Sequence, residues 1–265
     1  MSHTKLDIEK ANTTVGLFVS CMVDVLYPQV GVATVNLLAD QGVDVVFPEN
    51  QTCCGQPTFN AGQQDESYIL AANFLDIFAP MLERKEISAI VVPSGSCAAM
   101  IKHSYSILAE KKQSTELAKK CAIVSKNTYE LSEYLVDVLG VNPPQRDAPL
   151  EQLTYHPCCH LLRDLHVDRQ PRQLLAAITD NKLLPLSEAE TCCGFGGLFS
   201  LWNEELSVEM GLRKVKNKIT LISANGEIEV HDTVNMKMHD PYQWDSHQTR
   251  QFLPGSSHSR ASHQR

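Results

Sequence analysis

Two Cys-Cys-Gly tripeptides are the residues of this chain that are best suited to chemistry. They occupy positions 53–55 and 192–194, and each follows a single cysteine, Cys21 or Cys159, at a spacing of 32 or 33 positions. Two adjacent thiolates at one turn, together with a distant third, can bind a soft metal. The repetition of the pattern predicts two metal centres on two related halves of the chain, and it favours iron–sulfur clusters.

The first half offers a fourth thiol, Cys97, which follows Cys54 by 43 positions. The candidate metal ligands are therefore seven cysteines: Cys21, Cys53, Cys54, Cys97, Cys159, Cys192 and Cys193. Cys158 is an alternative to Cys159, which keeps a spacing closer to that of the first half. Glycines beside the paired cysteines would allow the backbone to approach a cluster closely. The candidate cofactor-binding glycines are Gly55, Gly194, Gly196 and Gly197.

The composition is typical of a globular protein, and a cytoplasmic location is the default expectation because no membrane-spanning run or convincing signal peptide is present. The chain has 265 residues, 43% of them hydrophobic, and a formal net charge of −8 at pH 7. This acidic balance argues against sequence-independent binding to nucleic acids, which requires a basic surface. No apolar run reaches the roughly 20 residues that a membrane-spanning helix requires. In a reducing cytoplasm, clustered cysteines are more often metal ligands than disulfides, so metal ligation is preferred to metal-free dithiol chemistry or unrelated buried thiols.

The elements that must position the first cysteines alternate between strands and helices. Three short apolar runs are typical of buried parallel strands: residues 15–20, 43–47 and 87–92. Helices are expected from Pro28 onward and over residues 67–82. This order predicts an α/β fold with a parallel sheet. Because ligand sites in such sheets lie beyond the carboxyl ends of the strands, the four thiols of the first half should converge at one edge.

The pattern restarts beyond a proline-containing linker candidate at residues 140–149. A short strand is expected over residues 153–156, and helices are expected over 171–177 and 204–218. This repetition predicts two related CCG-type units, each with a short parallel sheet flanked by helices. The expected boundaries are 12–142 for the first cysteine-rich domain, 150–224 for a second that is incomplete at its C-terminal end, and 225–265 for an irregular tail.

The second half has no cysteine near residue 236, where Cys97 would have its counterpart. From residue 225 onward the chain becomes rich in His, Gln, Ser and Arg, which is typical of a disordered polar tail. A histidine metal site is an alternative, although no ligand spacing recurs. A third hypothesis is out-of-frame translation, because reading the codons of Met238-His239 one nucleotide forward produces a cysteine codon, 45 positions after Cys193.

These motifs resemble the duplicated cysteine-rich CCG domain family. Three local stretches carry the resemblance together with the two tripeptides: residues 93–97, 155–160 and 192–197. The family includes the cysteine-rich subunit of heterodisulfide reductase, the iron–sulfur subunit of glycolate oxidase and the lactate-utilisation A proteins, and the stretches are most similar to the last group. The resemblance covers about residues 14–220. The chain contains no ferredoxin-type cysteine run, which sets it apart from the glycolate oxidase subunit.

The resemblance implies one or two clusters of the 4Fe–4S type per chain, since the second unit lacks its last cysteine. Some relatives use a final Cys-x-x-Cys, whose first position is Ser94 here. The implied function is an iron–sulfur electron-transfer subunit of a complex that oxidises L-lactate to pyruvate, with another iron–sulfur protein and a third subunit as partners. The alternatives are a heterodisulfide-reductase-like thiol–disulfide reductase subunit and a zinc-stabilised scaffold. No catalytic triad or carboxylate pair stands out, so enzymatic activity of the chain alone stays open.

Other side chains with conspicuous chemistry are expected to have structural roles. Cys121 fits neither centre and should be a buried thiol. Trp202 should contribute to a core, and Lys214 should lie at a solvated helix end. Arg163 and Arg169 are expected on solvated helix faces.

Overall fold

A four-stranded parallel sheet forms the centre of the first half of the protein. The computed structural model describes residues 13–142, 153–179, 183–215, 219–222 and 228–231. The sheet has the strand order β2-β1-β3-β4, with strands β1 (Thr13–Leu17), β2 (Val43–Val46), β3 (Ala89–Val92) and β4 (Thr128–Glu130). Strand β1 pairs in parallel with both β2 and β3, and β3 pairs in parallel with β4. The predicted parallel α/β fold is therefore confirmed, with β4 as a strand that the sequence patterns did not indicate.

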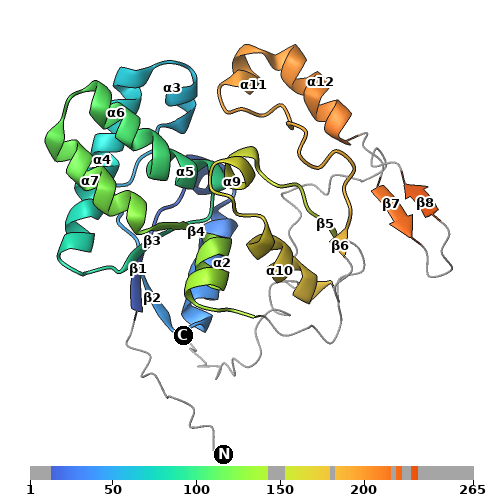
Figure 1. Ribbon diagram of the computed structural model, residues 1–265, viewed down its shortest axis with the longest axis horizontal. Coiled ribbons are helices and arrows are strands. Elements are labelled where there is room, and N and C mark those ends of the chain that lie inside the picture. The colour runs from blue at the N-terminus through green and yellow to red at the C-terminus, as the bar shows by residue number, and fades with distance from the viewer. Residues whose placement is uncertain (1–12, 143–152, 180–182, 216–218, 223–227, 232–265) are drawn as a thin grey trace, which may run out of the picture.

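Helices cover both faces of this sheet (Figure 1). They are α1 (Cys21–Leu26), α2 (Pro28–Asp40), α3 (Gln56–Asn60), α4 (Gln64–Glu83), α5 (Gly95–Ala99), α6 (Tyr105–Lys111), α7 (Thr115–Lys126) and α8 (Leu131–Glu133), with π-helical turns at Met100–Ser104 and Tyr134–Val138. Helices α4, α6 and α7 pack on one face, whereas α2 and the segment from α8 onward pack on the other.

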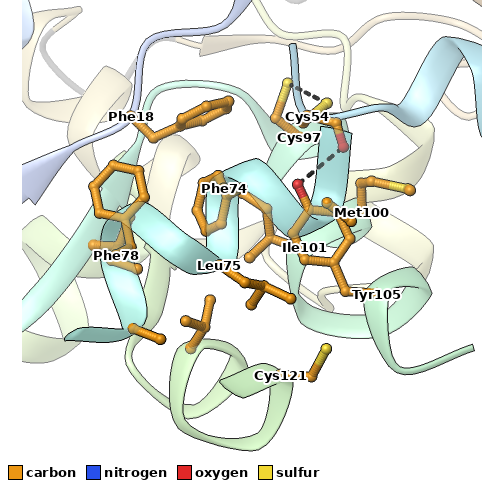
Figure 2. Close-up of a cluster of buried hydrophobic side chains, with 14 of the residues drawn as sticks. Phe18, Cys54, Phe74, Leu75, Phe78, Cys97, Met100, Ile101, Tyr105 and Cys121 are labelled. Atoms are coloured by element: carbon orange, nitrogen blue, oxygen red, sulfur yellow. Dashed lines mark hydrogen bonds between the residues drawn. The ribbon is translucent and has the colours of Figure 1, made fainter. Parts of the chain in front are cut away.

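Alternation along β3 divides the buried side chains between the two faces. Ile90 and Val92 belong to the core beneath α4, whereas Ala89 and Val91 belong to the core beneath α2. All four are buried, as expected for a parallel strand with both faces covered. In the larger core, the Phe74 ring meets Phe18 edge-on at a centroid distance of 5.0 Å (Figure 2). This core extends to Cys54 and Cys97, so the apolar interior reaches the predicted site.

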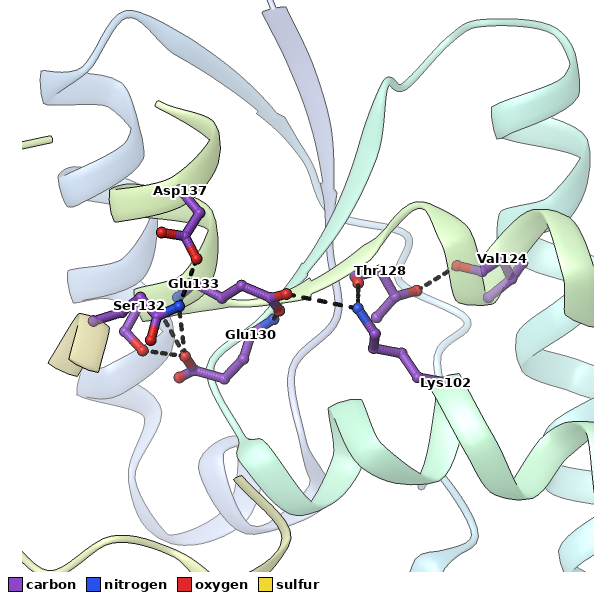
Figure 3. A network of polar contacts seen from close by, with 8 residues as sticks. Lys102, Val124, Thr128, Glu130, Ser132, Glu133 and Asp137 are labelled. Carbon is purple, nitrogen blue, oxygen red and sulfur yellow. Dashed lines mark hydrogen bonds and ion pairs between the residues drawn. The ribbon is translucent and has the colours of Figure 1, made fainter. Parts of the chain in front are cut away.

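A polar network fixes the carboxyl end of β4 (Figure 3). The Glu130 carboxylate caps α8, where it accepts a hydrogen bond from the Ser132 backbone N–H at 2.7 Å. Lys102 donates to the Thr128 carbonyl at 2.9 Å, and its Nζ lies 3.7 Å from the Glu133 carboxylate. Burial raises the pKa of the Glu130 carboxyl. These contacts tie β4 to the helical segment that follows α5.

The second half repeats the order of elements of the first. It contains β5 (Leu153–Thr154), α9 (Cys159–Arg163), α10 (Arg169–Ile178), β6 (Leu183–Leu184), α11 (Phe199–Trp202), α12 (Glu204–Val215), β7 (Ile219–Ile222) and β8 (Ile228–His231). Strands β5 and β6 pair in parallel, like β1 and β2. The halves diverge after α12, because β7 pairs antiparallel with β8, whereas β3 joins β1 in parallel.

The two halves pack against each other beside the carboxyl edge of the large sheet. Leu161 of α9 lies against Gly95 of α5, where an added Cβ would be 2.7 Å from the Leu161 Cβ. Arg169 and Gln170 of α10 both donate hydrogen bonds to the Asp137 carboxylate. The second half therefore covers the edge at which the first cysteines gather.

Some predicted segments lie wholly or partly outside the described residues. Most of the linker candidate does, as do positions 236 and 238 of the frame hypothesis. The predicted irregular tail contains β8, and its other residues are outside the described part of the chain. Among the described residues, no helix is long and apolar enough to cross a membrane.

Candidate metal centres

Cys21 is positioned by the turn from β1 into α1. The preceding residue, Ser20, caps the helix, and its Oγ accepts a hydrogen bond from the Val23 backbone N–H at 3.3 Å. This cap makes Cys21 the first residue of α1, just beyond the carboxyl end of β1, and its side chain is exposed. The Cys21 thiol therefore lies at the carboxyl edge of the sheet, as the strand that ends near this cysteine predicted.

The loop that carries Cys53 is tied to the end of β1 by one amide side chain. Gln51 accepts a hydrogen bond from the Val19 N–H at 3.0 Å and donates one to the Leu17 carbonyl at 2.8 Å. Its amide therefore replaces the strand pairing that ends there and brings the loop against the turn after β1. This contact cannot be predicted from sequence patterns, because Gln51 has no distinctive spacing from the other residues of the site.

Gly55 turns the backbone after Cys54. Its φ is +84°, and an added Cβ would lie 3.3 Å from the Ser67 carbonyl oxygen, so the turn requires glycine. The Gly55 carbonyl accepts hydrogen bonds from Thr58 Oγ1 at 2.9 Å and from Ser67 Oγ at 3.3 Å. The buried Tyr105 hydroxyl donates to the Cys54 carbonyl at 2.9 Å (Figure 2). The Cys-Cys-Gly turn is thus held from both sides.

The four cysteines of the first half come together as two contacting pairs. Ser94 caps α5 and accepts from the Cys97 backbone N–H at 3.4 Å, which places this thiol beyond the end of β3. The Sγ atoms of Cys54 and Cys97 are 3.3 Å apart, and those of Cys21 and Cys53 are 3.7 Å apart. The structure thus gathers the four predicted ligands of the first centre at the carboxyl edge of the sheet.

The hydrogen bonds between these thiols separate their pKa values. The contact with Cys53 and burial raise the pKa of Cys21, while the hydrogen bond from Cys21 lowers the pKa of Cys53. The contacts with Cys53 and Cys97 raise the pKa of Cys54, while the hydrogen bond from Cys54 lowers that of Cys97. In each pair the contact therefore raises the pKa of one thiol and lowers that of the other, and a thiol must lose its proton to bind a metal.

A cavity of about 570 Å³ adjoins the four sulfur atoms. Its other lining comes from both halves and includes Met22, Ser94, Phe195, Gly197 and Leu201. Among the described residues, no group of three or more His, Cys, Asp or Glu side chains is arranged to hold a metal ion. A polynuclear cluster differs, because its thiolate ligands need not meet at one atom. The all-sulfur donor set and the adjoining space fit such a group.

The second cysteine set has a related local geometry. Cys159 is the first residue of α9, as Cys21 is of α1, and Cys158 occupies the capping position. Burial and the neighbouring Cys192 raise the pKa of Cys159, while the positive charge of Arg163 lowers it. The Gly194 N–H donates to the Cys192 sulfur at 3.4 Å. The parallel with α1 supports the choice of Cys159 over Cys158, which stays a prediction.

The two Cys-Cys-Gly turns share a serine clamp that the sequence analysis missed. At Gly194, φ is +85° and an added Cβ would lie 2.5 Å from the Ser207 carbonyl oxygen. Ser207 Oγ donates to the Gly194 carbonyl at 2.9 Å, as Ser67 does to Gly55. Comparing the residues 12 or 13 positions after each glycine would have revealed this repeated serine.

The remaining candidate glycines lie in the turn after the second tripeptide, and Gly197 lies at the junction of the halves. Gly196 and Gly197 have φ values of +52° and +65°. An added Cβ on Gly197 would lie 3.6 Å from the Pro57 Cβ, so this turn is packed against the start of α3. A second link is made by Gln56, whose Nε2 lies 3.2 Å from His160 Nε2.

The expectations for the other side chains have mixed outcomes. Cys121 is buried in the larger core, as predicted, and burial raises its pKa to about 11. Arg163 is exposed and also donates to the Glu190 carbonyl at 3.1 Å. The expectation for Trp202 is wrong, because the residue is 60% exposed on the short helix α11. That for Lys214 is wrong too, because the residue is buried.

Comparisons with known proteins agree with the duplicated geometry. The chain matches the cysteine-rich domain family CCG over residues 15–102 and 153–225. It is 37% identical over 203 residues to Lactate utilization protein A 2 of Bacillus cereus strain 03BB102, covering 77% of this chain and 80% of that protein. It is 39% identical over 204 residues to Lactate utilization protein A of Bacillus pumilus strain SAFR-032, covering 77% and 81% of the two chains.

Proposed function

Because this chain belongs to the family of cysteine-rich CCG-domain proteins, we propose that it is an iron–sulfur electron-transfer subunit of a complex that oxidises L-lactate to pyruvate. The observation that carries the proposal is the meeting of four thiols in two contacting pairs beside one cavity. The relatives are named for lactate utilisation, and this supports lactate as the substrate in the proposal.

The proposal assigns a ligand role to each cysteine set. Cys21, Cys53, Cys54 and Cys97 would hold the first cluster. Cys159, Cys192 and Cys193 would contribute to the second. When bound, a cluster of the 4Fe–4S type supplies one-electron redox chemistry that no side chain of the protein offers.

The surrounding residues have distinct tasks in this proposal. The thiolate-favouring environments of Cys53 and Cys97 prepare them for ligation, because a ligand thiol must lose its proton. Gly55 lets the paired cysteines turn without a clash. Phe195 and Leu201 of the second half line the cavity and are themselves exposed, so a subunit docked over them would limit the access of water. Limited solvent access is one of the factors that set the reduction potential of a cluster.

A second candidate function is thiol–disulfide exchange. Two observations favour thiol–disulfide exchange. The Cys54 and Cys97 sulfurs are 3.3 Å apart, and they adjoin a cavity that residues of both halves line. A zinc-stabilised scaffold is the third candidate, since thiolates are also zinc ligands, but the described cysteines are not arranged around one metal ion. Metal content and colour separate the three, since zinc thiolates are colourless and a metal-free dithiol site contains neither iron nor zinc.

The proposed partners are another iron–sulfur protein and a third subunit of the lactate-oxidising complex. Exposed apolar side chains close to the thiol cavity support a subunit contact there: Val25, Leu26 and Tyr27 around α1, and Phe195, Leu201 and Trp202 around α11. A partner that docks over this region would lie next to Cys21, the exposed thiol of the first set. We place this assembly in the cytoplasm, where nine free cysteines would stay reduced.

Anaerobic purification followed by iron, sulfide and zinc analysis tests the proposal. We expect about four iron atoms per chain if one cluster is bound and about eight if two are bound, with broad visible absorption. Cys54→Ser should abolish the first cluster, whereas Cys121→Ser should leave the iron content unchanged because this thiol lies away from the paired sulfurs. A protein that contains only zinc, or a Cys54→Ser variant with the iron content of the parent, would refute the proposal.

A further inference from the structure

A lysine is buried beneath the second Cys-Cys-Gly turn. Lys214 of α12 is only 9% exposed, although lysine side chains almost never become fully buried without a partner. Burial lowers the pKa of Lys214, while the negative charges of Cys193 and Cys159 act in the opposite direction. The ammonium group therefore lies within electrostatic range of the second thiol set.

The hydrogen bonds of Lys214 match the three donors of an ammonium group. Its Nζ donates to the carbonyls of Glu188 and Ala189, both at 2.7 Å, and to that of Thr191 at 3.1 Å. An ammonium group has three hydrogens to donate, and a neutral amine has only two. All three donors thus have acceptors, and all three acceptors belong to the loop that leads into Cys192.

The equivalent position in the first half is occupied by an aromatic residue. Ser67 and Ser207 make the same clamp, and seven positions later the two helices carry Phe74 and Lys214. Phe74 is 2% exposed, and its ring lies 5.6 Å from that of Tyr105 in the larger core. One half therefore places an apolar ring beneath its turn, whereas the other places a positive charge there.

The side chains that hold the two loops differ in charge accordingly. Within the described residues, side-chain hydrogen bonds to the backbone of residues 50–55 come from neutral groups, including Asn73 and Tyr105. The loop of residues 188–191 instead receives hydrogen bonds from Lys214 and Arg163, and its Ala189 carbonyl also lies 2.9 Å from His156 Nδ1. Two cations therefore approach the second loop through its carbonyl groups.

We propose that Lys214 is a positioning residue of the second thiol centre. Its ammonium group holds the loop of residues 188–191 in place, which fixes the turn that carries Cys192 and Cys193, and it adds a fixed positive charge beside their thiolates. The role in a metal centre rests on the function proposed above, whereas the role in holding the loop does not. The two centres of this chain are consequently unequal in their electrostatic surroundings.

Hydrogen–deuterium exchange of the full-length, reduced protein tests the positioning role. Lys214→Met removes three hydrogen bonds and should speed amide exchange in residues 188–195 by at least tenfold, which corresponds to about 1.4 kcal/mol. Residues 50–56 should exchange as in the parent. Lys102→Met is the matched control, because it also removes a lysine bonded to a backbone carbonyl but should leave residues 188–195 unchanged. Unchanged exchange of residues 188–195 in Lys214→Met would overturn the proposal.

Two further measurements distinguish a local loss of the loop contacts from a general loosening of the fold, and test the effect of the charge on a bound cluster. If Lys214→Met also loosens residues 50–56, Lys214→Gln replaces it, because its amide has two donor hydrogens instead of three and carries no charge. Exchange in residues 188–195 should then still rise, although by less than tenfold, and unchanged exchange there would overturn the proposal. In protein reconstituted with iron and sulfide, Lys214→Met should lower the midpoint potential of the second centre alone, because a nearby positive charge favours the reduced cluster. A protein that binds no iron would refute the metal function, and the exchange experiment would still decide the positioning role.

Discussion

Replacing Gly55 by alanine should destabilise the protein more than the same replacement at Gly62. Both glycines have positive φ, +84° and +80°, so alanine suffers a similar backbone strain of about 1–2 kcal/mol at each. At Gly62 an added Cβ meets nothing within 4 Å, whereas at Gly55 it lies 3.3 Å from the Ser67 carbonyl oxygen and 3.4 Å from the Leu70 Cβ. Only Gly55 therefore carries an additional cost of overpacking, about 1–3 kcal/mol.

The expected losses of unfolding free energy are about 2–5 kcal/mol for Gly55→Ala and about 1–2 kcal/mol for Gly62→Ala. Urea denaturation of the reduced, metal-free protein measures both, and a total stability of about 5–15 kcal/mol leaves room for the difference. Gly55→Ala should also bind less iron, because the added methyl group displaces the turn that carries Cys53 and Cys54. Equal losses of unfolding free energy in the two variants would show that the close approach between Gly55 and Ser67 does not contribute to the cost of the substitution.

Two further predictions concern a buried carboxyl group and the metal-free thiols. Burial raises the pKa of Glu130 in the folded protein, so the stability that its protonated form contributes is lost as the pH rises through that pKa. Lowering the pH into the weakly acidic range should therefore stabilise the parent relative to Glu130→Gln. Curves of unfolding free energy against pH that run parallel for the two proteins would contradict this. Mild hydrogen peroxide should join Cys54 to Cys97 and Cys21 to Cys53 in the metal-free protein, because these sulfurs are 3.3 and 3.7 Å apart. Each pair of thiols gives up two protons and two electrons, which reduce one peroxide molecule to water. Peptide mass spectrometry that finds disulfides between other cysteines would refute this pairing of the four thiols.

Iron content provides the most direct check of the first ligand set. Cys54→Ser should lose the cluster of the first half and keep the folded sheet, because the serine side chain has nearly the same volume as the cysteine it replaces. Circular dichroism and iron analysis of the same sample separate loss of the cluster from loss of the fold. Cys121→Ser provides the control, since Cys121 lies in the larger core away from Cys54 and Cys97 (Figure 2).

Local patterns in the sequence were sufficient to predict the parallel sheet and the gathering of the first thiols. Short apolar runs that each end near a cysteine place those cysteines at one edge, because parallel strands all end on the same side of a sheet. The repeated tripeptide and its spacing likewise indicated two related halves, which the family comparison confirms. Strand β4 was missed, because Thr128–Glu130 is too short for its period to be recognised.

Only the tertiary structure decided which thiols pair and which charges lie near them. The contacts of Cys54 with Cys97 and of Cys21 with Cys53 depend on how separate loops pack, which no spacing along the chain encodes. Lys214 resembled a solvated residue because its sequence neighbours are charged, yet the loop before the second Cys-Cys-Gly turn folds over it and supplies three carbonyl groups. Burial is a property of the whole fold, since it depends on residues that are distant in the sequence but close in space.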